Sequence, residues 1–305
     1  MVNNYNPNGE LRRNFLVPPF SILDSKKYYW NEQKRFWISK GIQSELGRDA
    51  GCNVEMTNEN WEKYGRKPMP ATSIFDPFLC EIVYKWFCTK NGTILDPFAG
   101  GSVRGIVANC LGYKYTGIDL SEKQIKANVE QGEKILPDNK PTWLIGDSDE
   151  VLDTLTDAYD LVFTCPPYHD LEVYSEDEND LSNLDYDLFI KKYESILTKS
   201  IDKLKPNRFF VIVVSDIRDK NGFYKGFLED TVNIFLKNGL KKYNDIILAK
   251  PLGTLPIRAN NMFRNRKIGK CHENVLVFYK GSVKEIQDNF NEIDSTPKKN
   301  EVPWW

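Results

Sequence analysis

The strongest constraint on the fold is an alternation of short apolar runs with helix-periodic segments along most of the chain. The apolar runs have the length of buried strands, and the segments between several of them repeat apolar residues every three or four positions. Strands that alternate with helices form a mostly parallel sheet with helices on both faces. The sequence therefore predicts a Rossmann-like, doubly wound α/β fold.

The expected elements can be given by residue number. We expect strands at 93–95, 115–118, 142–145, 160–163, 208–214, 244–248 and 274–279, and helices at about 102–111, 121–134, 187–204 and 224–238. A further helix should carry the apolar residues from Phe75 to Phe87, with Ser73 as its N-cap. No convincing helical pattern separates the last two strands, which favours an antiparallel finish to the sheet.

The chain divides into three expected parts. Residues 1–70 are rich in aromatic and basic side chains with weak periodicity, which predicts an N-terminal extension of short helices and long loops. Residues 71–281 carry the regular alternation and form the main domain. Residues 282–305 are a polar C-terminal tail.

Composition excludes several classes of protein. The 41 basic and 43 acidic residues give a net charge of −2, which argues against a protein that coats nucleic acid along its whole surface. The six cysteines form no C-x-x-C pair, and His169 and His272 have no partners at ligand spacing, so we expect no metal and no disulfide framework. No apolar run could span a membrane and no secretory signal is visible, so we expect a cytoplasmic protein.

Polar groups follow consecutive strands of the expected sheet. The first strand runs into Asp96-Pro97-Phe98-Ala99-Gly100-Gly101-Ser102, the second ends at Asp119 and the third at Asp147. Glycines between a strand and a helix let a ligand approach free backbone N–H groups, and carboxylates at the next strand ends suit a ribose and an adenine amine. Ser102 occupies the middle glycine of the dinucleotide fingerprint, which disfavours a nicotinamide or flavin cofactor.

The fourth strand ends in a rigid aromatic segment, Cys165-Pro166-Pro167-Tyr168. Two prolines remove two backbone donors and fix φ, so nearby carbonyls are left as acceptors of fixed direction beside an aromatic ring. This arrangement suits a planar base that carries an exocyclic amine.

Together these segments resemble the S-adenosylmethionine-dependent amino-methyltransferases of DNA. Asp96 to Gly101 is similar to their D-P-F-x-G-x-G cofactor loop, and Cys165 to Tyr168 is similar to their [D/N/S]-P-P-[Y/F] catalytic motif. With residues 41–48 and 269–274, the pattern resembles DNA methylases common in bacteriophage and prophage genomes, some of which serve restriction–modification. The resemblance extends over about 73–281, which makes 71–281 the expected methyltransferase domain.

The resemblance implies a site and a cofactor, S-adenosyl-L-methionine. Cys165, Pro166, Pro167 and Tyr168 would be catalytic: the Pro166 carbonyl and the side chain at 165 would accept hydrogen bonds from the target amine, and Tyr168 would stack on the base. The expected cofactor-binding residues are Ser73, Asp96, Phe98, Ala99, Gly100, Gly101, Asp119, Leu120, Asp147 and Ser148. Asp96 and Gly100 would line the methionine end, Asp119 would bind the ribose and Asp147 the adenine.

Two residues depart from the family pattern. Ser102 replaces the last glycine of the loop, and Cys165 stands where Asp, Asn or Ser is usual. A neutral thiol is a weak acceptor, so either the backbone acts in its place or the thiol is partly ionised. The likeness of Cys to Ser slightly favours cytosine over adenine as the base. A thiolate that attacks a cytosine ring carbon is a weaker alternative, because in that family the nucleophile follows the proline.

The expected partner is double-stranded DNA. A basic segment without acidic residues lies between the last two strands and would contact phosphates through Arg258, Arg264, Arg266, Lys267 and Lys270. The aromatic and basic N-terminal region is the other candidate for target recognition, and the acidic segment 170–187 has no clear role beyond capping the next helix. An RNA amino-methyltransferase and a non-catalytic DNA-binding derivative are the alternatives. The sequence leaves open a homodimer and an accompanying nuclease.

Overall fold

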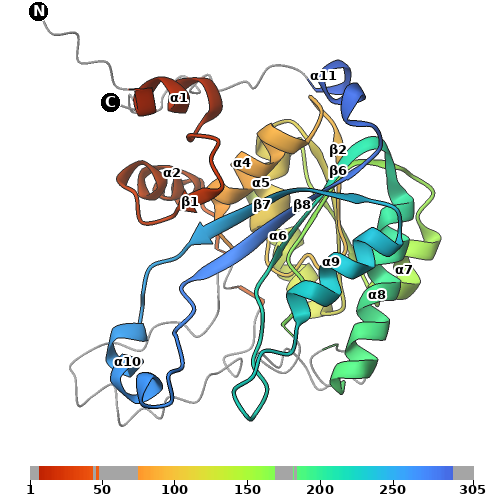
Figure 1. Cartoon of the computed structure of the whole chain (residues 1–305). Helices are drawn as coiled ribbons and strands as arrows, with labels where there is room; N and C mark the ends of the chain where they lie inside the picture. The colour runs from red at the N-terminus through yellow and green to blue at the C-terminus, as the bar shows by residue number, and fades with distance from the viewer. Residues whose placement is uncertain (1–6, 44–45, 48–74, 169–180, 182–183, 291–305) are drawn as a thin grey trace, which may run out of the picture.

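The computed structural model describes residues 7–43, 46–47, 75–168, 181 and 184–290, and the statements below concern these residues (Figure 1). The helices are α1 (Pro7–Phe15), α2 (Tyr28–Ser39), α4 (Pro77–Phe87), α5 (Val103–Cys110), α6 (Glu122–Ile135), α7 (Ser148–Thr154), α8 (Tyr186–Lys203), α9 (Phe227–Lys237), α10 (Leu255–Arg264) and α11 (Ile286–Asn289), with a 3-10 turn η3 (Val283–Glu285). The strands are β1 (Ile22–Asp24), β2 (Thr93–Asp96), β3 (Lys114–Asp119), β4 (Thr142–Ile145), β5 (Tyr159–Thr164), β6 (Leu204–Val214), β7 (Lys241–Ala249) and β8 (His272–Lys280).

These strands form one sheet in the order β1-β7-β8-β6-β5-β2-β3-β4. All neighbours are parallel except β8, which runs antiparallel to both β6 and β7. The chain winds outward from β2 through β3 to β4, then returns to β5 on the other side of β2. Ligands bind outside the carboxyl ends of the strands where the winding reverses. The expected doubly wound fold and its antiparallel finish are confirmed.

Helices cover both faces of the sheet (Figure 1). One apolar cluster packs α4, α5 and α6 against one face, and a second packs α7, α8 and α9 against the other. Strands such as β5, whose residues are all buried, therefore read as continuous apolar runs without alternation.

Every strand expected from 93 to 279 is present within a few residues, but three other expectations were wrong or incomplete. The N-cap of α4 is Asp76, whose carboxylate accepts from the backbone N–H groups of Phe78 and Leu79; Ser73 lies outside the described residues. A helix, α10, does separate the last two strands. This helix buries no residue, and its apolar side chains are half-buried or exposed. The edge strand β1 and the short α7 were not anticipated.

The described part of the N-terminal region packs onto the main domain. Trp30 lies edge-on to Phe78 with ring centroids 4.9 Å apart, and its indole N–H donates to Asp76. Trp37 donates to Glu81 on the same helix, α4. Because residues 48–74 lie outside the described residues, the domain boundary near residue 70 stays a prediction.

The first residues of the expected C-terminal tail also pack on the domain. Phe290, which follows α11, lies 5.0 Å from Phe209 of β6 between ring centroids. Among the helices that the structure describes, none combines the length and apolar character needed to cross a bilayer.

A buried carboxylate, Asp160, joins β5 to its neighbours at the end of the sheet opposite the switch point. It accepts from the Thr93 N–H at 3.0 Å, from Lys205 at 2.8 Å and from Arg208 at 3.1 Å. Burial alone would raise the pKa of Asp160, but these hydrogen bonds lower it to about 2. The charged carboxylate is therefore part of what stabilises the fold.

Replacing Asp160 by Asn should lower the free energy of unfolding at pH 7 by roughly 2 to 3 kcal/mol, because the folded pKa lies about 2 units below the unfolded value. This contribution is complete above the unfolded pKa near 4 and is lost as the pH falls toward 2. Urea denaturation of both proteins between pH 7 and pH 3 measures the difference. Asp153→Asn is the control, since Asp153 pairs with Lys199 at an exposed position and should change stability by less than about 1 kcal/mol. A difference between wild type and Asp160→Asn that does not change with pH would contradict the assignment.

Candidate active site

A cleft of about 760 Å³ opens at the carboxyl ends of the central strands. Its walls come from the loops after β2, β3, β4, β5, β6 and β7, from the start of β8, and from the first residues of α4. The expected site residues that line it are Phe98, Gly100, Gly101, Asp119, Leu120, Asp147, Ser148, Cys165, Pro166, Pro167, Tyr168, Arg258 and Lys270. The glycine turn and the proline segment therefore face one shared space.

The glycine turn is fixed by the strand beside it. Gly100 adopts φ +51°, a conformation that side-chain-bearing residues rarely adopt, and its N–H donates to Asp119 at 2.8 Å. Asp119 also accepts from the Ser121 N–H at 2.9 Å. Burial raises the pKa of Asp119, and these two hydrogen bonds partly offset that increase. Each carboxylate oxygen keeps a second lone pair for a ligand in the cleft.

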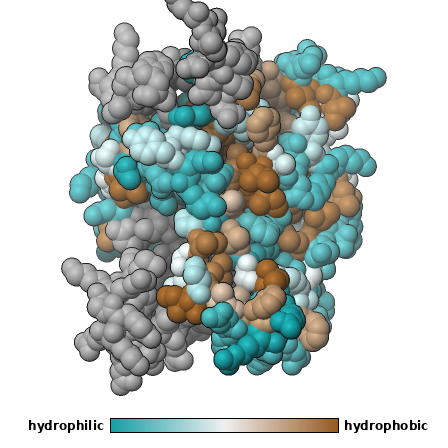
Figure 2. Space-filling view, turned by 60° about the vertical axis from the view of Figure 1, so that its left-hand side comes forward, coloured by the Kyte–Doolittle hydropathy of each residue, from teal (hydrophilic) through white to brown (hydrophobic). Residues whose placement is uncertain are grey.

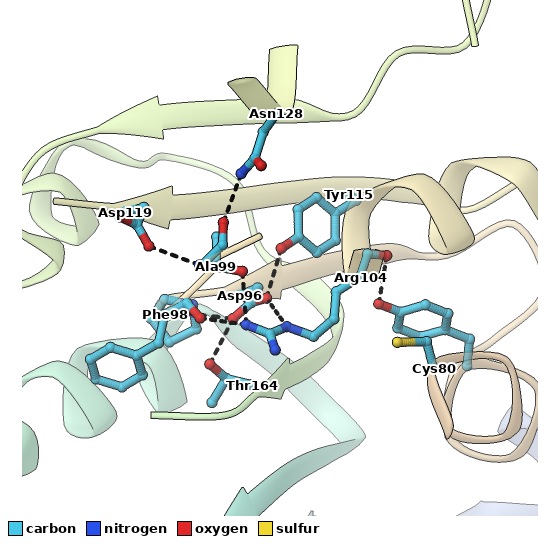
Figure 3. A network of polar contacts seen from close by, with 12 residues as sticks. Cys80, Asp96, Phe98, Ala99, Arg104, Tyr115, Asp119, Asn128 and Thr164 are labelled. Carbon is cyan, nitrogen blue, oxygen red and sulfur yellow. Dashed lines mark hydrogen bonds and ion pairs between the residues drawn. The ribbon is translucent and has the colours of Figure 1, made fainter. Parts of the chain in front are cut away.

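Beneath the turn lies a buried ion pair between Asp96 and Arg104 (Figure 3). Asp96 is fully buried and also accepts from the hydroxyls of Tyr115 at 2.7 Å and Thr164 at 2.6 Å. Arg104 in turn donates to the carbonyls of Phe98 and Ala99. Asp96 therefore shapes the cofactor loop from below and does not itself line the cleft.

Two other expected cofactor residues also act beneath the surface. Ala99 is completely buried and does not line the cleft. Ser148 lines it, but its hydroxyl donates to the Pro97 carbonyl at 2.5 Å, which joins the loop after β4 to the loop after β2. Both residues therefore support the shape of the cofactor loop.

Ser102, the departure in the loop, points away from the cleft. Its side chain is fully buried and donates to Gln131 of α6 at 3.1 Å. Gln131 also pairs with the backbone of Gln43 through two hydrogen bonds. The extra hydroxyl is thus used to connect α5 and α6 to the N-terminal region, and it leaves the ligand side of the turn unchanged.

The third strand end carries a pair that the sequence analysis did not anticipate. Asp147 caps α7 by accepting from the Asp149 N–H, and its second oxygen lies 2.6 Å from the ammonium of Lys192 on α8. Lys192 also lines the cleft. Since Lys192 stands in an ordinary amphipathic helix far along the chain, only the fold reveals this contact.

The proline segment forms the opposite wall. Cys165, Pro166, Pro167 and Tyr168 all line the cleft, and the Cys165 sulfur lies 3.9 Å from the Tyr168 hydroxyl. Burial raises the pKa of Cys165 to about 11. The thiol is therefore protonated at neutral pH, which answers the question that the sequence left open about its ionisation.

The basic segment after β7 approaches the same cleft. Arg258 and Lys270 line it, whereas Arg264, Arg266 and Lys267 are exposed on the surface of α10 and the turn that follows. Exposed apolar side chains, including Ile257 and Phe263, lie among these bases. Figure 2 shows hydrophilic and hydrophobic surfaces side by side at the lower end of the face that it presents.

Further lining residues complete this wall. Lys250, after β7, pairs with Glu273 of β8 at 3.0 Å, and both face the cleft beside Cys271 and His272. Gly47, from the segment 41–48, also lines the cleft. In the sequence, the resemblance of residues 41–48 and 269–274 to the family pattern pointed to these two segments, but it assigned no role to their residues.

Some expected features lie elsewhere. Ser73, His169 and most of the acidic segment 170–187 are outside the described residues, but Asp185 does cap α8 by accepting from the Leu188 N–H. After β6, Asp216 accepts from the Ile217 and Phe227 N–H groups, and Arg218 donates to the Gly222 carbonyl.

The residues of the cleft fit S-adenosylmethionine. The backbone of Gly100 and Gly101 forms an open turn without side chains, and Asp119 lies directly beside it with acceptor capacity for ribose hydroxyls. Asp147 stands at the next strand end, where an adenine amine could donate to it. Phe75, Leu79 and Phe98 add apolar surface to the same part of the cleft.

The raised pKa of Cys165 predicts slow reaction with iodoacetamide. At pH 7 the thiolate fraction should be roughly 300-fold lower than that of free cysteine, whose pKa is about 8.5, and the rate should keep rising above pH 9. Mass spectrometry of the Cys165 peptide after timed alkylation measures this rate, and a Cys165→Ser variant identifies the signal. Alkylation at pH 7 as fast as that of free cysteine would show that the thiol is ionised.

The chain was compared with known families and proteins. Residues 159–303 match the family model N6_N4_Mtase, described as DNA methylase. S-adenosylmethionine is the methyl donor of such enzymes, which confirms the expected cofactor. A search of curated proteins finds no significant match.

Similar solved structures include several methyltransferases of low sequence identity. TrmN from Thermus thermophilus is 13% identical with a TM-score of 0.45; the match covers 68% of this chain and 49% of that one, so this chain spans about half its length. A methyltransferase from Pyrococcus furiosus is 16% identical with a TM-score of 0.45, and the match covers 71% and 88%. Magnesium protoporphyrin IX methyltransferase from Synechocystis, with bound SAM, is 12% identical with a TM-score of 0.42, and the match covers 74% and 98%.

Proposed function

We propose that this methyltransferase modifies the exocyclic amine of a base in double-stranded DNA, and the match of residues 159–303 to the family model described as DNA methylase supports the proposal. The target is N4 of cytosine or N6 of adenine. The observation that carries the proposal is the shared cleft, in which the glycine turn with Asp119 faces the segment from Cys165 to Tyr168.

The proline segment would hold the target amine. An amine conjugated with a base ring is a poor nucleophile because its lone pair is delocalised into the ring. Hydrogen-bond acceptors for its two hydrogens turn the lone pair outward. Because Pro166 and Pro167 carry no backbone N–H, the carbonyls of this segment would be available as such acceptors. Since the thiol of Cys165 is protonated at neutral pH, the Pro166 carbonyl is the stronger of the two acceptors.

The residues on the cofactor side of the cleft would position S-adenosylmethionine and would take no part in acid–base chemistry. S-adenosylmethionine carries an electrophilic methyl group on a sulfonium centre. Asp119 and the Gly100 turn would hold the nucleoside part, and the buried pair of Asp96 and Arg104 would keep the turn rigid. Fixing two reactants in one cleft contributes most of the acceleration that such a reaction needs.

DNA would reach the cleft from the side of α10. Arg258 and Lys270 stand at the cleft wall and three further bases continue along the exposed surface, so phosphates on either side of the target could bind there. The exocyclic amine cannot enter the cleft while its base is stacked, so the base must leave the duplex.

The protonated thiol also bears on the main chemical alternative. Attack of Cys165 on a cytosine ring carbon requires a thiolate, and burial raises the pKa of this thiol to about 11. The amine route needs only the carbonyl acceptors and is therefore favoured.

The proposal is tested by incubating the protein with unmodified duplex DNA and S-adenosylmethionine, then digesting the DNA to nucleosides for mass spectrometry. A methyl group on deoxycytidine N4 or deoxyadenosine N6 supports the proposal and identifies the base. Methylation of RNA alone, or cofactor binding without transfer to any DNA, would overturn it. Cys165→Ser should keep at least a tenth of the activity, whereas complete loss would favour the thiolate route.

Replacing Asp119 by Asn should weaken S-adenosylmethionine binding by roughly 10- to 100-fold, because a hydrogen bond to a charged group is worth about 1.5 to 3 kcal/mol. Equilibrium dialysis with labelled cofactor measures the dissociation constant. Asp153→Asn is the matched control, since this carboxylate is 65% exposed on α7 and does not line the cleft. Equal affinities for wild type and Asp119→Asn would remove Asp119 from the cofactor site.

A further inference from the structure

The loop between β6 and α9 forms a short, well-braced hairpin, residues 215–226. Arg218 and Tyr224 pair as an antiparallel bridge, and the Lys225 N–H donates to the Ile217 carbonyl at 2.9 Å. At its base, one carboxylate oxygen of Asp216 accepts from both Ile217 and Phe227. These contacts hold the two arms of the hairpin together.

The tip of the hairpin is fixed as well. The Asp219 N–H donates to the Phe223 carbonyl at 2.8 Å, and the Asp219 side chain accepts from the Phe223 N–H at 2.9 Å. Arg218 donates to the Gly222 carbonyl and its guanidinium lies 3.8 Å from the Tyr224 ring centroid. The backbone of Phe223 thus makes two hydrogen bonds to Asp219, while the residue as a whole is 73% exposed.

The hairpin stands at the rim of the active-site cleft. Ser215, Asp216 and Ile217 line that cleft together with the proline segment. On its other side, the ammonium of Lys270 lies 5.9 Å from the Tyr224 ring, so the hairpin adjoins the basic segment. In Figure 1 the hairpin, in teal, and α10, in blue, project beyond the same end of the strands.

A base that leaves a duplex leaves a gap in the stack. Proteins that distort DNA often insert an apolar side chain between neighbouring bases, which compensates for part of the lost stacking. Such a side chain should be apolar, held on a rigid backbone and placed outside the pocket that receives the base. Phe223 meets all three conditions.

We propose that Phe223 inserts into the duplex and fills the space that the target base vacates. This inference rests on the proposed function and assigns a positioning role that acts on the DNA, apart from methyl transfer. The basic residues beside the hairpin, Lys270 among them, would hold the phosphates that flank the gap.

Other exposed apolar residues fit less well. Leu252 is 52% exposed but lines the cleft itself, where the extruded base would lie. Ile257 and Phe263 lie on α10, which buries no residue, and neither lines the cleft. Tyr224 is covered on one face by Arg218.

The test compares duplex and single-stranded substrates of one sequence, chosen from the sites that the nucleoside assay maps. Phe223→Ala should lower kcat/KM on the duplex by roughly 10- to 100-fold, since stacking on an aromatic side chain is worth about that factor per base. On the single strand, which needs no extrusion, kcat/KM should change by less than about threefold. A mismatch at the target should reduce the duplex defect, and Phe223→Trp should restore most of the activity.

Leu236→Ala is the matched control, because Leu236 is an apolar residue of α9 that is 48% exposed and does not line the cleft. It should behave as wild type on both substrates. Unchanged duplex activity in Phe223→Ala, or an equal loss on duplex and single strand, would overturn the role of Phe223 while leaving the proposed function intact. If the wild-type protein methylates no DNA, the proposed function fails and this inference fails with it.

Discussion

The active-site cleft depends on one buried ion pair, that of Asp96 and Arg104. The two side chains are 0% and 5% exposed, so both charges have lost nearly all contact with water. Such a pair is stable only when its remaining donors and acceptors are also satisfied. Here Tyr115, Thr164 and two loop carbonyls complete the set, and they come from β3, β5 and the turn after β2. The network therefore fixes the relative position of the strands that meet at the switch point.

This network explains why the loop after β2 can remain open. A turn with Gly100 at positive φ has little intrinsic preference for one conformation, because glycine has so much backbone freedom. Arg104 holds the turn through the carbonyls of Phe98 and Ala99, Asn128 holds the Gly100 carbonyl at 2.7 Å, and Asp119 holds the Gly100 N–H. Rigidity thus comes from side chains below and beside the turn, and its upper surface stays free for a ligand.

The sequence predicted the sheet and the motifs better than the contacts between distant elements. Buried parallel strands are continuous apolar runs, so β2 to β8 could be found from local pattern alone, and the residues at their carboxyl ends had to meet. Asp96, however, looked like a ligand residue, because nothing local showed that Arg104 and Tyr115 would enclose it. Lys192 and the hairpin at 215–226 were missed for the same reason. Helix α10, which is short and buries no residue, was missed as well.

The distribution of charge around the cleft favours one orientation for a polyanion. Asp119 and Asp147 lie at the ends of β3 and β4, and Lys192 offsets the charge of Asp147 at 2.6 Å. Arg258 and Lys270 line the same cleft, and further basic residues continue onto the outer surface. In the proposed function, the basic residues of this wall would attract a nucleic acid before any base is contacted. In the proposed function, a base turned inward from that wall would meet the acceptor carbonyls of the proline segment, which lines the same cleft.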